Sequence, residues 1–211
     1  MYLNSLLTRT RKGRINSPFS VFNVSYIKQK LKKLFNVSLT FQKIYGILQS
    51  QKGKKGKVKM NRLIFDMDGT IAALYNVENW LSKLRAEDAS PYAEAAPMWD
   101  MEMLRLVLEN LSCWEVVVVS WGSKGATSQF DEEVRKVKTE WLQRYDFPVA
   151  RRNVHIVPYG TPKQRYKARK SSRSILIDDN QEIRDKFSSY ENCAAVDPTQ
   201  VDIIQFLASL I

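Results

Sequence analysis

From Met60 onward, short hydrophobic runs alternate with longer segments in which apolar and polar residues are mixed. A run that is apolar almost throughout, and too short for a helix, is typical of a strand buried on both faces of a parallel sheet. The pattern therefore predicts a parallel sheet of about five strands, at residues 63–67, 116–119, 154–157, 175–177 and 194–196.

Between these runs, apolar residues recur at three- and four-residue spacing, which predicts helices over about 101–111, 130–141 and 203–210. We expect these stripes to form core rather than binding surface. Strands that alternate with helices favour right-handed crossovers and a doubly wound, Rossmann-like α/β fold. Residues 71–100 depart from the alternation and predict a small cap insert, with one short amphipathic helix around Trp80 and Leu84.

Charge divides the 211-residue chain into two parts. The net charge is +11, but residues 1–59 hold 14 Lys and Arg and no acidic residue. Residues 60–211 hold 19 basic and 22 acidic residues and so carry −3. We expect 60–211 to be the folded domain and 1–59 to be a basic, disordered extension, since its lysine-rich end at 52–59 cannot pack.

Three explanations of residues 1–59 remain open. An acid-free segment with Arg and Ser fits an organelle leader. A basic arm fits contact with nucleic acid. The segment also fits a mis-assigned start, because Lys and Gly codons can be all purine and the run at 52–59 stands just before Met60, as a bacterial ribosome-binding site would. We favour this last explanation, with a bacterial or phage-encoded protein.

Other features exclude some classes of function. No run approaches the ~18 apolar residues of a membrane span, so we expect a cytoplasmic protein without a membrane partner. Cys113 and Cys193 form no Cys/His cluster, which argues against zinc. We expect both to be buried, reduced thiols. His155 is expected to be a strand residue without a catalytic role.

Polar residues follow four of the predicted strands, and in an open parallel sheet ligands bind at those strand ends. Side chains two apart on an extended backbone point the same way. Gly69 permits an unusual backbone conformation just after the first pair. The candidates are Asp66 and Asp68, then Ser120, Lys163, and Asp178 with Asp179.

Several carboxylates that converge would repel one another, and a hard cation such as Mg²⁺, which prefers oxygen ligands, resolves the repulsion. With a hydroxyl and a lysine nearby, the set is typical of phosphoryl transfer. Alternatives remain for single positions. Ser123 could replace Ser120, Lys167 or Lys170 could replace Lys163, and 178–180 could be only a helix cap.

The run Asp66-Met67-Asp68-Gly69-Thr70 resembles the first motif of the haloacid dehalogenase superfamily. Ser120, Lys163 and the Asp178-Asp179 pair are similar to its second, third and fourth motifs, so the resemblance covers about residues 60–211. It implies a phosphatase in which Asp66 is the nucleophile and Asp68 the general acid and base. Asp66, the Asp68 backbone carbonyl, Asp178 and Asp179 would hold Mg²⁺, and Ser120, Lys163, Gly69 and Thr70 would bind the phosphoryl group.

A small cap leaves the site open, and aromatic residues in its neighbourhood could stack on a nucleobase. We expect Trp80, Tyr92, Trp99 and Trp121 there. Residues 75–92 also resemble bacterial or phage 5′-deoxyribonucleotidases, which implies a nucleotide as the small phosphorylated substrate. A phosphatase of nucleic-acid ends guided by 1–59, and an inactive domain used as a binding module, are the alternatives. The oligomeric state is not predicted.

Overall fold

The computed structural model describes residues 60–169 and 171–211. The predictions for residues 1–59 and for Lys170 lie outside these ranges. Within them, no helix combines the length and the hydrophobicity that crossing a membrane requires.

Five parallel strands form one sheet, as predicted. Their order is β3-β2-β1-β4-β5, and all four neighbouring pairs are parallel. β2 is longer than predicted, since it begins two residues earlier and ends two residues later. The strands are β1 (Asn61–Phe65), β2 (Trp114–Trp121), β3 (Val154–Val157), β4 (Ser174–Ile177) and β5 (Cys193–Val196).

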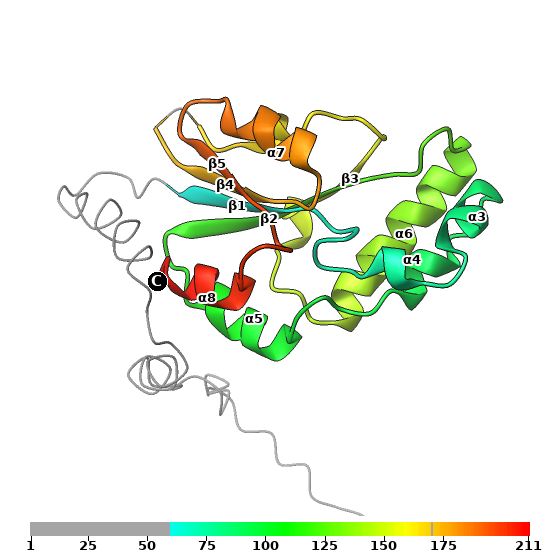
Figure 1. Cartoon of the computed structure of the whole chain (residues 1–211), viewed down its shortest axis with the longest axis horizontal. Coiled ribbons are helices and arrows are strands. Elements are labelled where there is room, and N and C mark those ends of the chain that lie inside the picture. The colour runs from blue at the N-terminus through cyan, green and yellow to red at the C-terminus, as the bar shows by residue number, and fades with distance from the viewer. Residues whose placement is uncertain (1–59, 170) are drawn as a thin grey trace, which may run out of the picture. The chain divides into compact units, whose positions relative to one another are not determined.

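Helices cover both faces of this sheet, which confirms the Rossmann-like α/β prediction. In Figure 1, α7 (Gln181–Ser188) lies on one face, and α5 (Met101–Glu109) and α8 (Ile203–Ala208) lie on the other. The longest helix among the described residues, α6 (Ser128–Arg144), connects β2 to β3. Each of these helices begins after a side chain that accepts a hydrogen bond from a backbone N–H of the first turn: Asp100, Thr127, Asn180 and Asp202.

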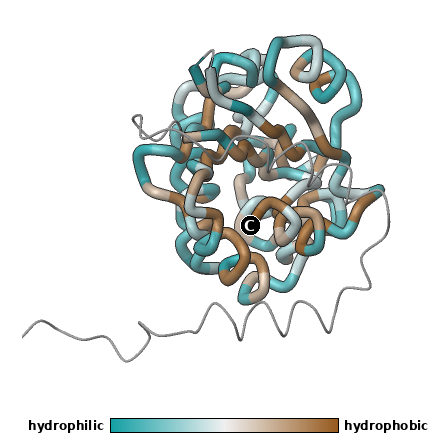
Figure 2. The backbone as a smooth tube through the Cα atoms, turned by 90° about the vertical axis from the view of Figure 1, so that its left-hand side faces the viewer, coloured by the Kyte–Doolittle hydropathy of each residue, from teal (hydrophilic) through white to brown (hydrophobic). Residues whose placement is uncertain are grey.

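The central strands are apolar throughout because both of their faces are buried. Along β1, Leu63 and Phe65 join the core under α5 and α8, whereas Ile64 joins a second cluster with Phe187 of α7. Successive side chains of a strand point to opposite faces, so a two-sided core needs a continuous apolar run. In Figure 2 the hydrophobic stretches run through the middle of the described domain.

Between β1 and α5 the chain forms the 3-10 helix η1 (Leu74–Asn76), α3 (Trp80–Arg85) and α4 (Ser90–Glu94). This insert packs against the first half of α6 through a small core of its own, seen beside α6 in Figure 1. The core joins Leu74 and Tyr92 of the insert to Phe130 and Val134 of α6. The insert therefore packs against α6, next to the carboxyl end of β1.

One prediction about the cysteines is wrong. Cys113 is exposed and Cys193 is only partly buried. Cys113 lies in the turn just before β2, where the chain has not yet entered the sheet. His155 lies in β3 as expected and packs its ring against Tyr166, with 4.6 Å between centroids.

Candidate active site

The order of the strands places the first and fourth motifs side by side. The chain proceeds from β1 to β2 and β3 in one direction, and then crosses to β4 and β5 on the other side of β1. Ligands of open α/β sheets bind where the order reverses, at the carboxyl ends of the strands. Asp66 directly follows β1 and Asp178 directly follows the adjacent β4, so both carboxylates lie at this point.

Three carboxylates meet there. One oxygen from each of Asp66, Asp178 and Asp179 lies within 4.8 Å of the others, which allows the three to ligate one metal ion. Burial and the neighbouring Asp66 carboxylate raise the pKa of Asp179 to about 6 and also raise the pKa of Asp178. The charged forms repel one another, and a cation would relieve that repulsion.

Lys163 neutralises part of this charge. Its Nζ lies 2.8 Å from Asp66 Oδ1 and 2.7 Å from Asp178 Oδ2, and the residue is only 3% exposed. Burial disfavours the ammonium charge, but the two carboxylates outweigh it and raise the pKa of Lys163. Lys167 lies instead near the ring of Tyr190, 5.5 Å from its centroid.

Asp68 has a separate partner that sequence reasoning missed. Lys138 of α6 is fully buried, and its Nζ donates to Asp68 Oδ2 at 2.5 Å. Burial raises the pKa of Asp68, and the Lys138 charge opposes that rise. The sequence did carry a signal: Lys138 stands four residues after Val134 and three before Trp141, on the buried stripe of α6.

The remaining motif residues lie around these carboxylates rather than on the cavity surface. Ser120 is fully buried and its hydroxyl accepts a hydrogen bond from Lys138. Gly69 has φ +71° and its N–H donates to the Ala72 carbonyl. The hydroxyl of the buried Thr70 accepts the backbone N–H of Asp179 at 3.2 Å. Thr70 thus links the loop after β1 to the loop after β4.

The helix-cap alternative holds for Asn180 but does not account for the two aspartates before it. The Asn180 side chain accepts the N–H of Ile183 and begins α7. Asp178 uses Oδ1 to accept the N–H of Asn180, while its Oδ2 accepts from Lys163. One oxygen of Asp178 supports the loop and the other belongs to the acidic cluster.

A cavity of about 510 Å³ opens above the carboxylates. Three of the four aromatic residues expected there line it, whereas Trp99 packs against the main core. Ser123, the alternative to Ser120, also lines it and shares a 2.9 Å hydrogen bond with Tyr92. The lining joins the acidic residues and Lys163 to aromatic side chains and to two exposed basic ones: Asp66, Asp68, Asp178, Asp179, Tyr75, Trp80, Tyr92, Trp121, Tyr159, Arg85 and Lys124.

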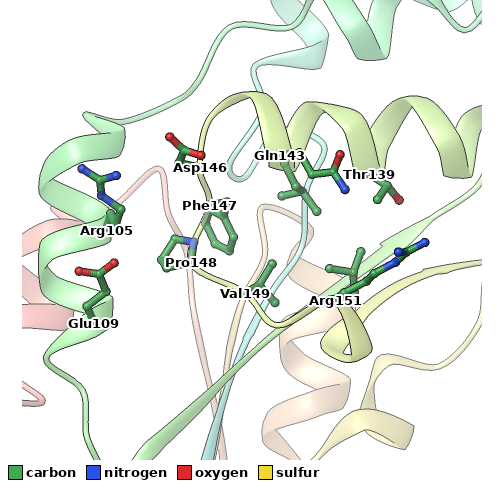
Figure 3. A pocket seen from close by; sticks show the side chains of 11 residues that line it. Arg105, Glu109, Thr139, Gln143, Asp146, Phe147, Pro148, Val149 and Arg151 are labelled. Atoms are coloured by element: carbon green, nitrogen blue, oxygen red, sulfur yellow. The ribbon is translucent and has the colours of Figure 1, made fainter. Parts of the chain in front are cut away.

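A second cavity, of about 520 Å³, lies between α5 and the end of α6. Figure 3 shows Arg105 and Glu109 on one side of it and Thr139 and Gln143 on another. None of the motif residues lines it. The carboxylates and the lysine that the sequence singles out therefore line the first cavity and not this one.

No protein-family model matches the chain, and no curated protein matches it. Among solved structures, a chain from "Structure of Pnkp1/Rnl/Hen1 complex" is similar, with a TM-score of 0.43 and 13% identity. The similarity covers 71% of this chain and 50% of that chain, so this chain spans half the length of that protein. A similarity this distant does not indicate the activity of this chain.

Proposed function

We propose that this protein is a Mg²⁺-dependent phosphatase that cleaves phosphate monoesters through an aspartyl-phosphate on Asp66. The observation that carries the proposal is the meeting of Asp66 with Asp178, Asp179 and Lys163 under an open cavity. A carboxylate nucleophile beside a lysine and a cluster of cation ligands is suited to phosphoryl transfer. The resemblance of the motifs to the haloacid dehalogenase superfamily supports the same reaction.

In the first step, a carboxylate oxygen of Asp66 attacks phosphorus, and the bond from phosphorus to the ester oxygen breaks. Asp68 gives its proton to the departing oxygen. In the second step, Asp68 takes a proton from water, which attacks the phosphorus, releases inorganic phosphate and restores the Asp66 carboxylate. Lys163 has two of its three N–H groups on Asp66 and Asp178 and can offer the third to a phosphoryl oxygen.

The oxygen donors fit Mg²⁺, which favours carboxylates and retained waters. Asp66, Asp178 and Asp179 would hold the ion, with the Asp68 backbone carbonyl as the further ligand that the resemblance implies. Bound there, Mg²⁺ would neutralise the carboxylates and the charge on the transferring phosphoryl group.

Two aromatic pairs on the cavity lining favour a nucleotide as the substrate. Tyr75 and Trp80 have ring centroids 5.1 Å apart, and those of Trp121 and Tyr159 are 5.0 Å apart. Any of the nucleobases can stack on such rings, because every base has an aromatic face. The exposed Arg85 and Lys124 favour, as the second candidate, the phosphorylated end of a nucleic acid, because they could contact a neighbouring phosphate.

The test is phosphate release from p-nitrophenyl phosphate, nucleoside monophosphates and end-phosphorylated oligonucleotides, with Mg²⁺ or EDTA. Asp66→Asn should lower Mg²⁺-dependent turnover roughly 10³-fold or more, because no other group replaces the nucleophile. Asp146→Asn, a change at the second cavity, is the matched control and should keep turnover.

Equal turnover of wild type and Asp66→Asn would refute the mechanism. Folded wild-type protein that binds Mg²⁺ but releases no phosphate from any substrate would favour the inactive binding module. A preference for oligonucleotide ends that disappears when residues 1–59 are deleted, and that weakens with salt, would favour the second candidate.

A further inference from the structure

Lys138 is a fully buried cation, and every hydrogen-bond donor that it has is in use. Its Nζ donates to Asp68 Oδ2 at 2.5 Å, to Ser120 Oγ at 2.9 Å and to the Trp121 carbonyl at 2.7 Å. A lysine ammonium has three N–H groups and no acceptor, so these three bonds saturate it. The ring of Tyr92 covers it, with 4.3 Å from Nζ to the centroid.

This saturation gives Lys138 a different task from Lys163. A phosphoryl oxygen could bind Lys138 only if one of the three bonds broke, in a place that solvent does not reach. A buried charge is costly unless it is paired and hydrogen-bonded, and replacing it by an apolar side chain is often neutral or favourable for stability. Stability alone therefore gives little reason for a lysine on the buried stripe of α6.

The bonds have consequences for the two partners that the proposed reaction uses. Asp68 Oδ2 is held by Lys138, whereas its buried Oδ1 has no hydrogen-bond partner among the described residues. The bond to Oδ2 fixes the position of the Asp68 carboxyl, which lines the cavity. Ser120 Oγ must accept from Lys138, which leaves its own O–H free to donate.

Resting on the proposed phosphatase function, we propose that Lys138 is a positioning residue for the reaction. It holds the Asp68 carboxyl in place to exchange the proton with the leaving group, and it fixes the Ser120 hydroxyl as a donor. Lys138 contacts neither the phosphoryl group nor the Asp66 cluster in this arrangement. Its loss should therefore affect the departure of the leaving group more than the binding of substrate.

The experiment compares Lys138→Met with the wild type on two substrates in saturating Mg²⁺. Nitrophenolate leaves without a proton, whereas the alkoxide of β-glycerophosphate needs one from Asp68. Lys138→Met should lower kcat/KM for β-glycerophosphate about tenfold or more beyond its effect on p-nitrophenyl phosphate, since acid catalysis contributes roughly 10²–10⁴-fold. Lys136→Met, at an exposed lysine of the same helix, is the matched control and should change neither value.

A Lys138→Met effect of equal size on both substrates, or no effect, would overturn the inference, because a merely structural role does not distinguish leaving groups. If Lys138→Met does not fold, Lys138→Gln is measured, and the same difference between substrates is expected, since a neutral amide cannot hold Asp68 as an ammonium does. The proposed function fails separately: wild-type protein that releases phosphate from neither of these substrates, nor from nucleotides or oligonucleotide ends, would reject it, whatever the variants do.

Discussion

Gly69→Ala gives a quantitative test of how the loop after β1 is built. Gly69 has φ +71°, and a Cβ placed on it would lie 2.4 Å from Tyr75 Cε2 and 2.6 Å from Asp179 Oδ2. Ordinary contacts between carbon atoms are ~3.5–4.0 Å, so the Tyr75 ring must retreat by about 1 Å. Gly125 is the matched control, because it has the same φ of +71° and a Cβ added to it would meet nothing within 4 Å.

Both variants place an alanine in the left-handed region of backbone conformation, which destabilises each of them by about 1–2 kcal/mol. Only Gly69→Ala also disturbs the packing of Tyr75 on Trp80, and an aromatic pair contributes about 0.5–1.5 kcal/mol beyond its buried area. Gly69→Ala should therefore unfold about 1 kcal/mol more easily than Gly125→Ala, which for a domain of this size is roughly 2–4 °C in Tm.

The assay is urea or thermal unfolding of both variants, followed by Mg²⁺ titration of phosphatase activity. Displacement of the Asp179 carboxylate should raise the Mg²⁺ concentration needed for half-maximal activity in Gly69→Ala only. Equal stability of the two variants, together with an unchanged Mg²⁺ requirement, would refute the close packing of Gly69 against Tyr75 and Asp179.

Two further predictions concern charge. In EDTA, Asp179→Asn should be more stable than the wild type at pH 7 and should lose that advantage as the pH falls to about 4. The reason is that a carboxyl with its folded pKa raised to about 6 binds protons more tightly when folded, so its ionisation above that pH opposes folding; a constant difference across chemical unfolding from pH 4 to 7 would contradict this. Lys163→Met should lower the free energy of unfolding by about 3–5 kcal/mol in EDTA, because it leaves buried carboxylates unpaired. Added Mg²⁺ should stabilise this variant more than the wild type in thermal unfolding, and an equal shift would count against a cation site beside Lys163.

The sheet was predictable because its strands are apolar on both faces, as Leu63, Ile64 and Phe65 are. A helix was harder to predict where few residues carry its hydrophobic face. α7 was anticipated only through the possible helix cap at 178–180, since Ile183 and Phe187 are the two residues that pack it against the sheet. α4 was missed, because it is one short turn that begins with Ser90 and Pro91.

Within the candidate site, the convergence of residues that follow strand ends could be predicted from the sequence, since the topology brings those ends together. Asp66 and Asp178 directly follow β1 and β4, Lys163 stands in the connection after β3, and the structure places Lys163 in contact with both aspartates. Lys138 was missed because nothing near it in the sequence indicates its partner. Asp68 lies 70 positions away along the chain, and only the packing of α6 against the site joins them.

In the proposed reaction, the charges of the site oppose the binding of a phosphate unless a cation is present. When the aspartates of the site are ionised, four carboxylates face two ammonium groups, which leaves a net charge of −2. A phosphate ester also carries negative charge, so the cluster without a cation repels the substrate that it would cleave. One divalent cation would cancel the excess, and the third N–H of Lys163 could then meet a phosphoryl oxygen. In the proposed reaction, Asp68 is paired with Lys138, and Asp66 is paired with Lys163, which it shares with Asp178. These separate environments fit the different tasks that we propose for the two aspartates, proton carrier and nucleophile.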